Sequence, residues 1–295
     1  MSSADQFLLD KRHMRRAFED AAAAYDAVAV LQREVGARLL ERLDLVRLAP
    51  RRLIDVGCGT GLCTLALAQR YADAQTVALD IAPSMVRAAR AKTTWWQRWR
   101  GRYQFICGDA EALPVADASV DLIVSNLTLQ WCSDLDRAFA EFKRVLAPQG
   151  LVLFSTLGPD TLHELREAWR SADEATHVNA FIDMHDVGDA LMRAGFADPV
   201  MDMEYMTVTY PDVLALMRDL KQLGAHNVTA GRKRGLTGRR QLQRVVDGYE
   251  QWRRDGVLPA TYEVVYGHAW APPASSGGRS ERGVATVSLE DIRRK

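Results

Sequence analysis

Short apolar segments alternate with helical patterns from residue 52 onward. Five apolar segments of strand length are present, and all but the third are followed by a stretch of helical period, an alternation that predicts a parallel sheet with right-handed crossovers. The predicted strands are Leu53–Val56, Gln75–Leu79, Tyr103–Cys107, Val120–Ser125 and Leu151–Thr156. The helices between them are predicted at Leu62–Tyr71, at Pro83–Lys92, and from the capping box Ser133–Asp136 to the breakers Pro148 and Gly150.

The segments on either side of this alternating core have different patterns. Before the first strand, Val28, Leu31, Val35, Leu39 and Leu43 recur at helical spacing, which predicts a core-facing helical stripe. After the fifth strand, helices are predicted at Gly158–Ala172, Met184–Ala194, Asp212–Leu223 and Arg239–Arg254, and strands at Val200–Thr209 and Tyr262–Trp270.

These elements predict the organisation of the chain. We expect an α/β fold of the Rossmann-like kind, with a seven-stranded, mainly parallel sheet and helices on both faces. The predicted parts are a helical lid (1–47), a ligand-binding α/β domain (48–210), a helical insertion for substrate recognition (211–258), the last strand (259–272) and a disordered tail (273–295).

The first strand ends in a glycine-rich loop. Gly57, Gly59 and Gly61 stand at alternate positions, where they permit positive φ and let a ligand approach the backbone N–H groups at the start of a helix. One glycine in such a loop is often needed for geometry alone. Asp55 changes the interpretation, because its carboxylate would repel a pyrophosphate and attract an ammonium group. The loop therefore favours S-adenosylmethionine (AdoMet) over a dinucleotide, and it resembles the signature of class I methyltransferases.

Polar residues also end the next three strands. Asp80 stands where a carboxylate commonly binds ribose hydroxyls, Asp109 could read the adenine edge, and Asn126 would lie below the methionine part of the ligand. Tyr25 and Gln32 are candidate lid residues above the same edge, although Tyr25 could equally have a packing role. The predicted cofactor-binding residues are Tyr25, Gln32, Asp55, Gly57, Gly59, Gly61, Asp80, Ile81, Met85, Asp109, Ala110 and Asn126.

Composition and charge exclude several classes of protein. Lys+Arg and Asp+Glu number 38 each in 295 residues, so no global charge indicates a nucleic-acid or membrane partner. The chain has no apolar run of membrane-spanning length and no signal-like start, which predicts a cytoplasmic protein. Cys58, Cys63, Cys107 and Cys132 form no CxxC pair, and we expect reduced core or loop residues and no metal site.

A tryptophan-rich segment precedes the third strand. Trp95, Trp96 and Trp99 are interleaved with arginines, a pattern that could stack on bases. Because the chain is neutral overall and the run is short, we expect instead a helix extension whose rings pack on the domain.

The acceptor of the methyl group is a separate question. Transfer from a sulfonium is an in-line displacement, and a base is needed only when the acceptor must lose a proton. The strand ends offer no obvious histidine dyad, which favours an acceptor that is already ionised, such as a carboxylate. Tyr25 and three residues of the insertion, Arg218, Lys221 and His226, are candidates for positioning it.

The insertion also carries a basic run without an acid. It is either a solvated face or a docking patch for an acidic carrier protein, a membrane surface or RNA phosphates. Its members are Arg232, Lys233, Arg234, Arg239, Arg240 and Arg244.

Several local motifs resemble the malonyl-[acyl-carrier protein] O-methyltransferases over about Arg16 to Trp270. The motifs include Phe18 with Ala21–Tyr25, Leu31–Gln32, Ser125–Leu127 with Gln130–Trp131, His163–Leu165 with Ala168–Trp169, His177–Phe181, Met217–Ala225, Gly231–Arg232, Leu236–Thr237 and Pro259–Tyr262. The resemblance implies methylation by AdoMet of the free malonyl carboxylate on acyl carrier protein, an early step of biotin synthesis, with S-adenosylhomocysteine as product. We expect a monomer without nucleic-acid, membrane or metal partners. The alternatives are a methyltransferase for a quinone precursor or small acid, and a respiratory complex I assembly factor with the same fold.

Overall fold

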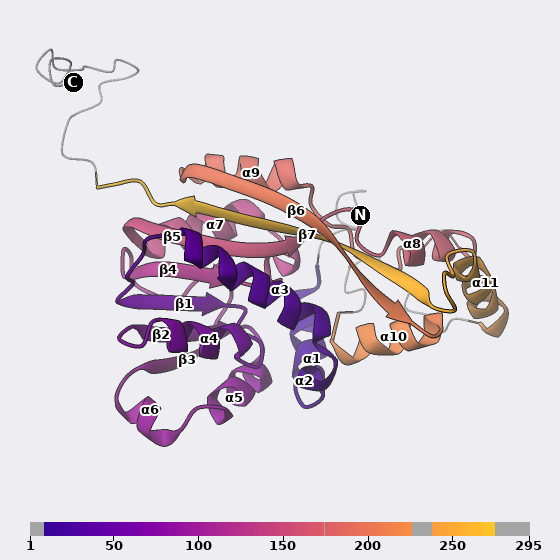
Figure 1. Cartoon of the computed structure of the whole chain (residues 1–295), viewed down its shortest axis with the longest axis horizontal. Helices are drawn as coiled ribbons and strands as arrows, with labels where there is room; N and C mark the ends of the chain where they lie inside the picture. The colour runs from indigo at the N-terminus through magenta and orange to yellow at the C-terminus, as the bar shows by residue number, and fades with distance from the viewer. Residues whose placement is uncertain (1–8, 174, 226–237, 275–295) are drawn as a thin grey trace, which may run out of the picture.

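The computed structural model describes residues 9–173, 175–225 and 238–274, and these contain one seven-stranded sheet (Figure 1). The strand order is β3-β2-β1-β4-β5-β7-β6, with β7 antiparallel to both of its neighbours and the other pairs parallel. The strands are β1 Arg52–Val56, β2 Gln75–Asp80, β3 Tyr103–Cys107, β4 Val120–Ser125, β5 Leu146–Leu157, β6 Ala197–Tyr210 and β7 Leu258–Trp270. The predicted seven-stranded, mainly parallel sheet is confirmed.

Helices cover both faces of this sheet. They are α1 Lys11–Ala21, α2 Tyr25–Val28, α3 Val30–Glu41, α4 Leu62–Arg70, α5 Pro83–Ala91, α6 Trp95–Trp99, α7 Leu135–Val145, α8 His163–Arg170, α9 Met184–Arg193, α10 Val213–Gln222 and α11 Arg239–Glu250, with short 3-10 turns η2 Arg42–Leu45 and η3 Leu129–Trp131.

Alternation along the strands divides the core into two parts. On β1, Leu53 packs into the same cluster as Val35 of α3, whereas Ile54 packs into the cluster that contains Phe139 and Phe142 of α7. Successive strand residues point to opposite faces, so strands that are apolar at successive positions need helices on both sides. This is why the central strands read as uninterrupted apolar runs.

The start of β5 differs from the sequence prediction. Helix α7 ends at Val145 and β5 begins at Leu146, so Pro148 and Gly150 lie inside the strand, next to an irregularity in its pairing with β4. A pairing irregularity is a position where a strand tolerates proline. The N-cap of α7 is Asp134, whose side chain accepts from the Arg137 N–H, and Ser133 does not cap the helix.

The N-terminal segment predicted as a lid divides into two parts. Val35, Leu39 and Leu43 are fully buried, so α3 and the following turn belong to the core. Helices α1 and α2 lie at the carboxyl edge of the sheet (Figure 1), and α1 contacts α5. Met14 and Phe18 of α1, Tyr25 of α2, and Leu31 and Gln32 at the start of α3 line the main cavity.

The last two strands are longer than predicted. Strands β6 and β7 pair from Ala197 to Tyr210, and they project past the carboxyl edge of the sheet (Figure 1). Helices α8, α10 and α11 gather around this projection, with α11 against α8 and α10 against β6. At both ends of β6, half-buried and exposed residues alternate and a proline stands nearby. This sequence pattern is typical of a loop, so the ends were not predicted as strand.

The tryptophan segment corrects a prediction. Helix α6 forms with a capping box between Thr94 and Gln97, but Trp95, Trp96 and Trp99 are 58%, 53% and 73% exposed. Trp95 stacks on Trp96, with ring centroids 4.0 Å apart, instead of packing on the domain. A helix of five residues projects its rings around more than one turn, so one neighbouring surface cannot cover all of them.

The four cysteines are free thiols, as predicted. Cys58 and Cys63 are buried, Cys132 is half-buried, and Cys107, at the end of β3 where the loop to Asp109 begins, is exposed. No helix in the described part of the chain has both the length and the apolar character needed to cross a membrane.

Candidate active site

The glycine loop has the backbone that its sequence requires. Gly57, Gly59 and Gly61 have φ of 74°, 52° and 88°. A Cβ on Gly57 would lie 1.9 Å from the Thr128 hydroxyl oxygen, and one on Gly61 would lie 2.9 Å from the Ala89 Cβ. Only Gly59 is open, toward Tyr25, at 3.9 Å. Gly57 and Gly59 line the cavities beside the loop, whereas Gly61 serves close packing at the start of α4.

Asp55 is buried at the end of β1 with one oxygen engaged. The Thr64 hydroxyl donates to its Oδ2 at 2.6 Å, and its Oδ1 has no hydrogen-bond partner among the described residues. Burial, aided by the nearby Asp80 carboxylate, raises the Asp55 pKa to about 7. Gln32 Oε1 is likewise buried without a partner in the described structure, and both residues line one narrow cavity. Two acceptors in one cavity suit the ammonium group of an amino-acid ligand.

Asp80 closes β2 at the floor of the main cavity. Its two oxygens accept from the Gly59 N–H at 2.9 Å and the Ala82 N–H at 2.8 Å, and burial raises its pKa. A carboxylate has further lone pairs beyond these two bonds, so it can still accept from ribose hydroxyls.

Asp109 follows β3, and each of its two carboxylate oxygens has a partner. Its Oδ2 lies 2.6 Å from Lys11 Nζ of α1, and its Oδ1 accepts from the Glu111 N–H at 3.0 Å. Lys11 also lies 2.8 Å from Glu111 Oε2. Ion pairs of Lys11 therefore connect helix α1 to the loop that would contact adenine.

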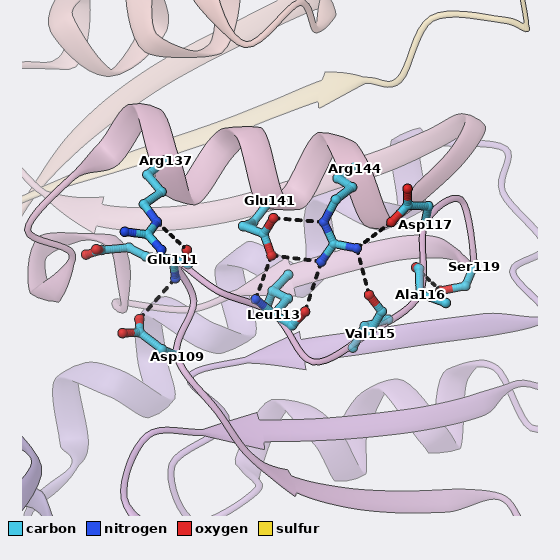
Figure 2. Close-up of polar contacts among 10 residues, drawn as sticks. All are labelled: Asp109, Glu111, Leu113, Val115, Ala116, Asp117, Ser119, Arg137, Glu141 and Arg144. Carbon is cyan, nitrogen blue, oxygen red and sulfur yellow. Dashed lines mark hydrogen bonds and ion pairs between the residues drawn. The ribbon is translucent and has the colours of Figure 1, made fainter.

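Helix α7 fixes that loop from the other side (Figure 2). Arg137 donates to the Glu111 carbonyl, and Arg144 donates to the carbonyls of Leu113 and Val115 and to the carboxylates of Glu141 and Asp117. The loop between β3 and β4 thus takes its shape from side chains of a regular helix.

Asn126 and Tyr25 stand at the junction of the two cavities. Asn126 Nδ2 donates to the Gln32 carbonyl at 3.0 Å and its Oδ1 accepts from Ser155 at 2.8 Å, so it ties α3 to the sheet. Burial and the nearby Asp80 carboxylate raise the Tyr25 pKa above its ordinary value. The Tyr25 hydroxyl therefore keeps its proton at neutral pH and acts as a donor.

The main cavity continues beyond the cofactor residues. Ile81, Met85 and Ala110 line it together with Asp80 and Asp109. The far end, which we call the acceptor end, is lined by Leu157, Thr161, Leu162, Asn179, Phe181, Leu220, Leu223 and Tyr262.

Two predicted positioning residues are not at this cavity. Helix α10 directs Leu220 and Leu223 inward, whereas Arg218 and Lys221 are exposed, and Arg218 Nε donates to the Leu214 carbonyl. The residues that approach the acceptor end from α10 are therefore apolar. His226 lies outside the described residues.

Sequence reasoning missed most of the acceptor end as a site. Its residues come from β5, the turn before α8, the segment before α9, the end of α10 and β7, and no single local motif joins them. Phe18 of α1 and Trp131 were noticed only through the family resemblance. Their rings meet edge to face with centroids 5.2 Å apart, and both line the cavity.

The basic run falls partly within the described chain. Arg239, Arg240 and Arg244 are exposed on α11, and Arg232, Lys233 and Arg234 lie outside the described residues. Among the described residues, no group of three or more His, Cys, Asp or Glu side chains could hold a metal ion.

The fold and this cavity define a class I AdoMet-dependent methyltransferase. The family model of the methyltransferase domain matches residues 54–154. Solved structures of the YcgJ protein from Bacillus subtilis and of a putative methyltransferase from Bacillus halodurans share the fold, with TM-scores of 0.56 and 0.55 at 15% and 19% identity, each over 80% of this chain and 98% of the other.

Closer relatives define the family. The chain is 57% identical to the malonyl-[acyl-carrier protein] O-methyltransferase of Methylovorus sp., over 92% of this chain and 93% of the relative. It is 48% identical to that of Halorhodospira halophila, over 100% and 99%. The chain belongs to the malonyl-[acyl-carrier protein] O-methyltransferase family.

Proposed function

We propose that the chain transfers the methyl group of AdoMet to the free carboxylate of a malonyl group carried by acyl carrier protein, an early step of biotin synthesis. Membership of the family supports the substrate. The observation that carries the chemistry is the apolar acceptor end, where Phe181, Leu220 and Leu223 face the cofactor residues across one cavity. A cytoplasmic, monomeric enzyme that needs no metal is part of the same proposal.

The acceptor end suits a carboxylate because the reaction cancels charge. When bound, AdoMet supplies an electrophilic methyl on a sulfonium, and a carboxylate oxygen that takes this methyl leaves two neutral products. A surrounding of low dielectric lowers the barrier of a reaction in which opposite charges cancel in the transition state. A poorly hydrated carboxylate is also a better nucleophile. The apolar side chains exclude water, and Thr161, Asn179 and Tyr262 supply the neutral polar groups at the cavity wall.

The residues of the cofactor end have separate tasks. Asp55 and Gln32 would hold the ammonium group, and Asp80 the ribose. Tyr25, protonated above Gly59, would donate to a carboxylate and close the site from the lid side. Because a carboxylate acceptor has no proton to lose, no residue is assigned as a general base.

The direct test is incubation of the full chain with methyl-labelled AdoMet and malonyl-acyl carrier protein. The expected product is a base-labile methyl ester on the carrier. Label transfer to a quinone precursor, with none to the malonyl carrier, would replace this proposal by the alternative acceptor.

Helix α11 supplies the carrier-docking part of the proposal. Arg239 and Arg240 occupy its first turn, where the helix dipole disfavours cations, so helix stability does not account for them. An acidic carrier protein is a partner of matching charge.

Charge reversal tests this docking. Replacing Arg239, Arg240 and Arg244 by Glu should raise KM for malonyl-acyl carrier protein about tenfold or more and change KM for malonyl-pantetheine little. The matched control reverses the charge of three other exposed arginines by replacement with Glu. Arg87 and Arg90 lie on α5, and Arg100 follows α6. An equal effect of both triple variants, or an equal effect on both substrates, would contradict docking at α11.

A further inference from the structure

A second cavity, which we call the α8 groove, adjoins the acceptor end. Asn179 and Phe181 line both cavities, so one wall separates the groove from the place where the acceptor carboxylate would react. The opposite side of the groove is formed by Arg166, Trp169 and Arg170 of α8.

Two cations face this groove from one helix. Arg166 is half-buried, and its guanidinium donates to the carbonyls of Pro159 at 2.8 Å and Thr161 at 3.0 Å. These bonds engage two of about five guanidinium N–H donors. Burial and the neighbouring Arg170 lower the Arg166 pKa, which shows that the two charges lie close enough to repel each other. An anion between them would relieve that repulsion.

One part of the groove wall is aromatic. Trp169 and His177 stack with ring centroids 3.6 Å apart, and His177 lies 2.7 Å from Asp173 Oδ1. Asp173, the acid in this wall, also accepts from the Ala175 N–H and from Gln241 of α11. Its charge is thus engaged by donors, and the same contact places the groove beside the helix that carries the docking arginines.

We propose that the α8 groove binds the 4′-phosphopantetheine arm of the substrate, with Arg166 and Arg170 holding its phosphate and Phe181 marking the entry of the thioester into the acceptor end. The inference rests on the proposed function, because it assumes a malonyl thioester as substrate. An arm that starts at a carrier docked on α11 meets the arginines of α8 first and the shared wall of Asn179 and Phe181 next. A single anionic group on a long, flexible, polar arm matches two adjacent cations beside the wall that the two cavities share.

The test compares two small substrates that differ only in the phosphate, malonyl-4′-phosphopantetheine and malonyl-pantetheine, with no carrier protein present. For the wild-type chain, kcat/KM should be about tenfold higher for the phosphorylated substrate. Arg170→Gln, at an exposed position of α8, should reduce this ratio to about one, and Arg170→Lys should retain part of it. The control Glu167→Gln, exposed on the same helix, should keep the wild-type ratio.

Each outcome has a distinct meaning. A wild-type ratio near one, or a ratio unchanged in Arg170→Gln, overturns the phosphate site while leaving the proposed function intact. Methylation of neither small substrate, with malonyl-acyl carrier protein still methylated, overturns this inference alone, and methylation of none of the three overturns the proposed function as well. Inhibition of the wild type gives a second measurement that needs no variant, because free 4′-phosphopantetheine should inhibit about tenfold more strongly than pantetheine. Equal inhibition by the two would again remove the site.

Discussion

Asp55 shows how one buried side chain can join stability to ligand binding. Its pKa of about 7 in the folded chain lies above the ordinary value of an aspartate, about 4. Between these two pH values the unfolded chain binds fewer protons than the folded chain. The free energy of unfolding should therefore fall as pH rises from about 4 to about 7, by at most roughly 4 kcal/mol from this group.

Asp55→Asn should remove that decline, because an amide does not ionise. Chemical denaturation of both proteins between pH 4 and 8 measures the effect. The unfolding free energy of Asp55→Asn minus that of the wild type should increase as pH rises. A loss of stability from placing an amide beside Thr64 would be the same at every pH and would not change this trend. Parallel curves would show that Asp55 titrates normally in the folded chain.

Binding of AdoMet should show the opposite pH dependence. An ionised Asp55 attracts the ammonium group of the ligand, so wild-type affinity should increase from pH 6 to pH 8 as the carboxylate loses its proton. Asp55→Asn should bind about tenfold more weakly at pH 8 and show a flatter profile, by calorimetry. An unchanged profile would move the ammonium group to another partner.

Residues at strand ends could be predicted from the sequence, whereas those of the acceptor end could not. Asp55, Asp80 and Asp109 each follow an apolar run, and parallel strands bring such ends together. Arg218 and Lys221 were chosen for charge, but which face of α10 turns inward depends on Leu220 and Leu223 meeting a distant cavity wall. Packing of that kind has no local sequence signal.

At the scale of elements, helix α7 shapes the loop that follows β3. All five N–H donors of Arg144 are used: Nε and one Nη2 proton on Glu141, one Nη1 proton on Asp117, and the others on two loop carbonyls (Figure 2). Its partners raise the Arg144 pKa, so the charge persists at any working pH.

Arg144→Met should lower the free energy of unfolding by about 2 to 3 kcal/mol, because it leaves Glu141 and the loop carbonyls without their donor. AdoMet affinity should also fall several-fold, since the same loop carries Asp109 and Ala110. Arg193→Met is the matched control: Arg193 is 57% exposed and pairs with Asp136 of α7, a surface pair worth at most about 1 kcal/mol. Equal losses in the two variants would mean that the loop network adds nothing beyond an ordinary ion pair.

Elements that follow from a local sequence pattern could be predicted, whereas elements that depend on distant strands could not. Central strands and the helices between them follow from apolar period, and their positions are confirmed within a few residues. The early start of β5 and the long projection of β6 and β7 depend on pairing between distant strands that tolerates proline at Pro148 and Pro259. The tryptophan rings of α6 are exposed because no neighbouring element covers them in the described structure, and the sequence of α6 alone does not show this.

At the scale of the whole molecule, the lid and the insertion meet each other above the sheet. Gly224, just after α10, has φ of 71°, and a Cβ there would lie 3.0 Å from the Ala17 carbonyl oxygen of α1. Helix α10 also contacts α2. The cover of the cofactor end and the wall of the acceptor end are therefore in contact, and closure over AdoMet should shape the place where the acceptor binds.

Gly224→Ala tests this coupling. The new Cβ meets a backbone atom that cannot turn away, so α10 must move from α1, and both the Kd for AdoMet and the KM for the malonyl substrate should rise several-fold. Gly195→Ala is the matched control, because Gly195 has φ of 80° with open space around its Cβ position. Each variant should lose about 1 to 2 kcal/mol of stability from the backbone strain alone. If lid and insertion act independently, Gly224→Ala will raise KM for the malonyl substrate without changing the Kd for AdoMet.

Hydrogen exchange then locates the effect: AdoMet should protect α1, α2 and α10 together in the wild type and in Gly195→Ala, and α10 should lose that protection in Gly224→Ala.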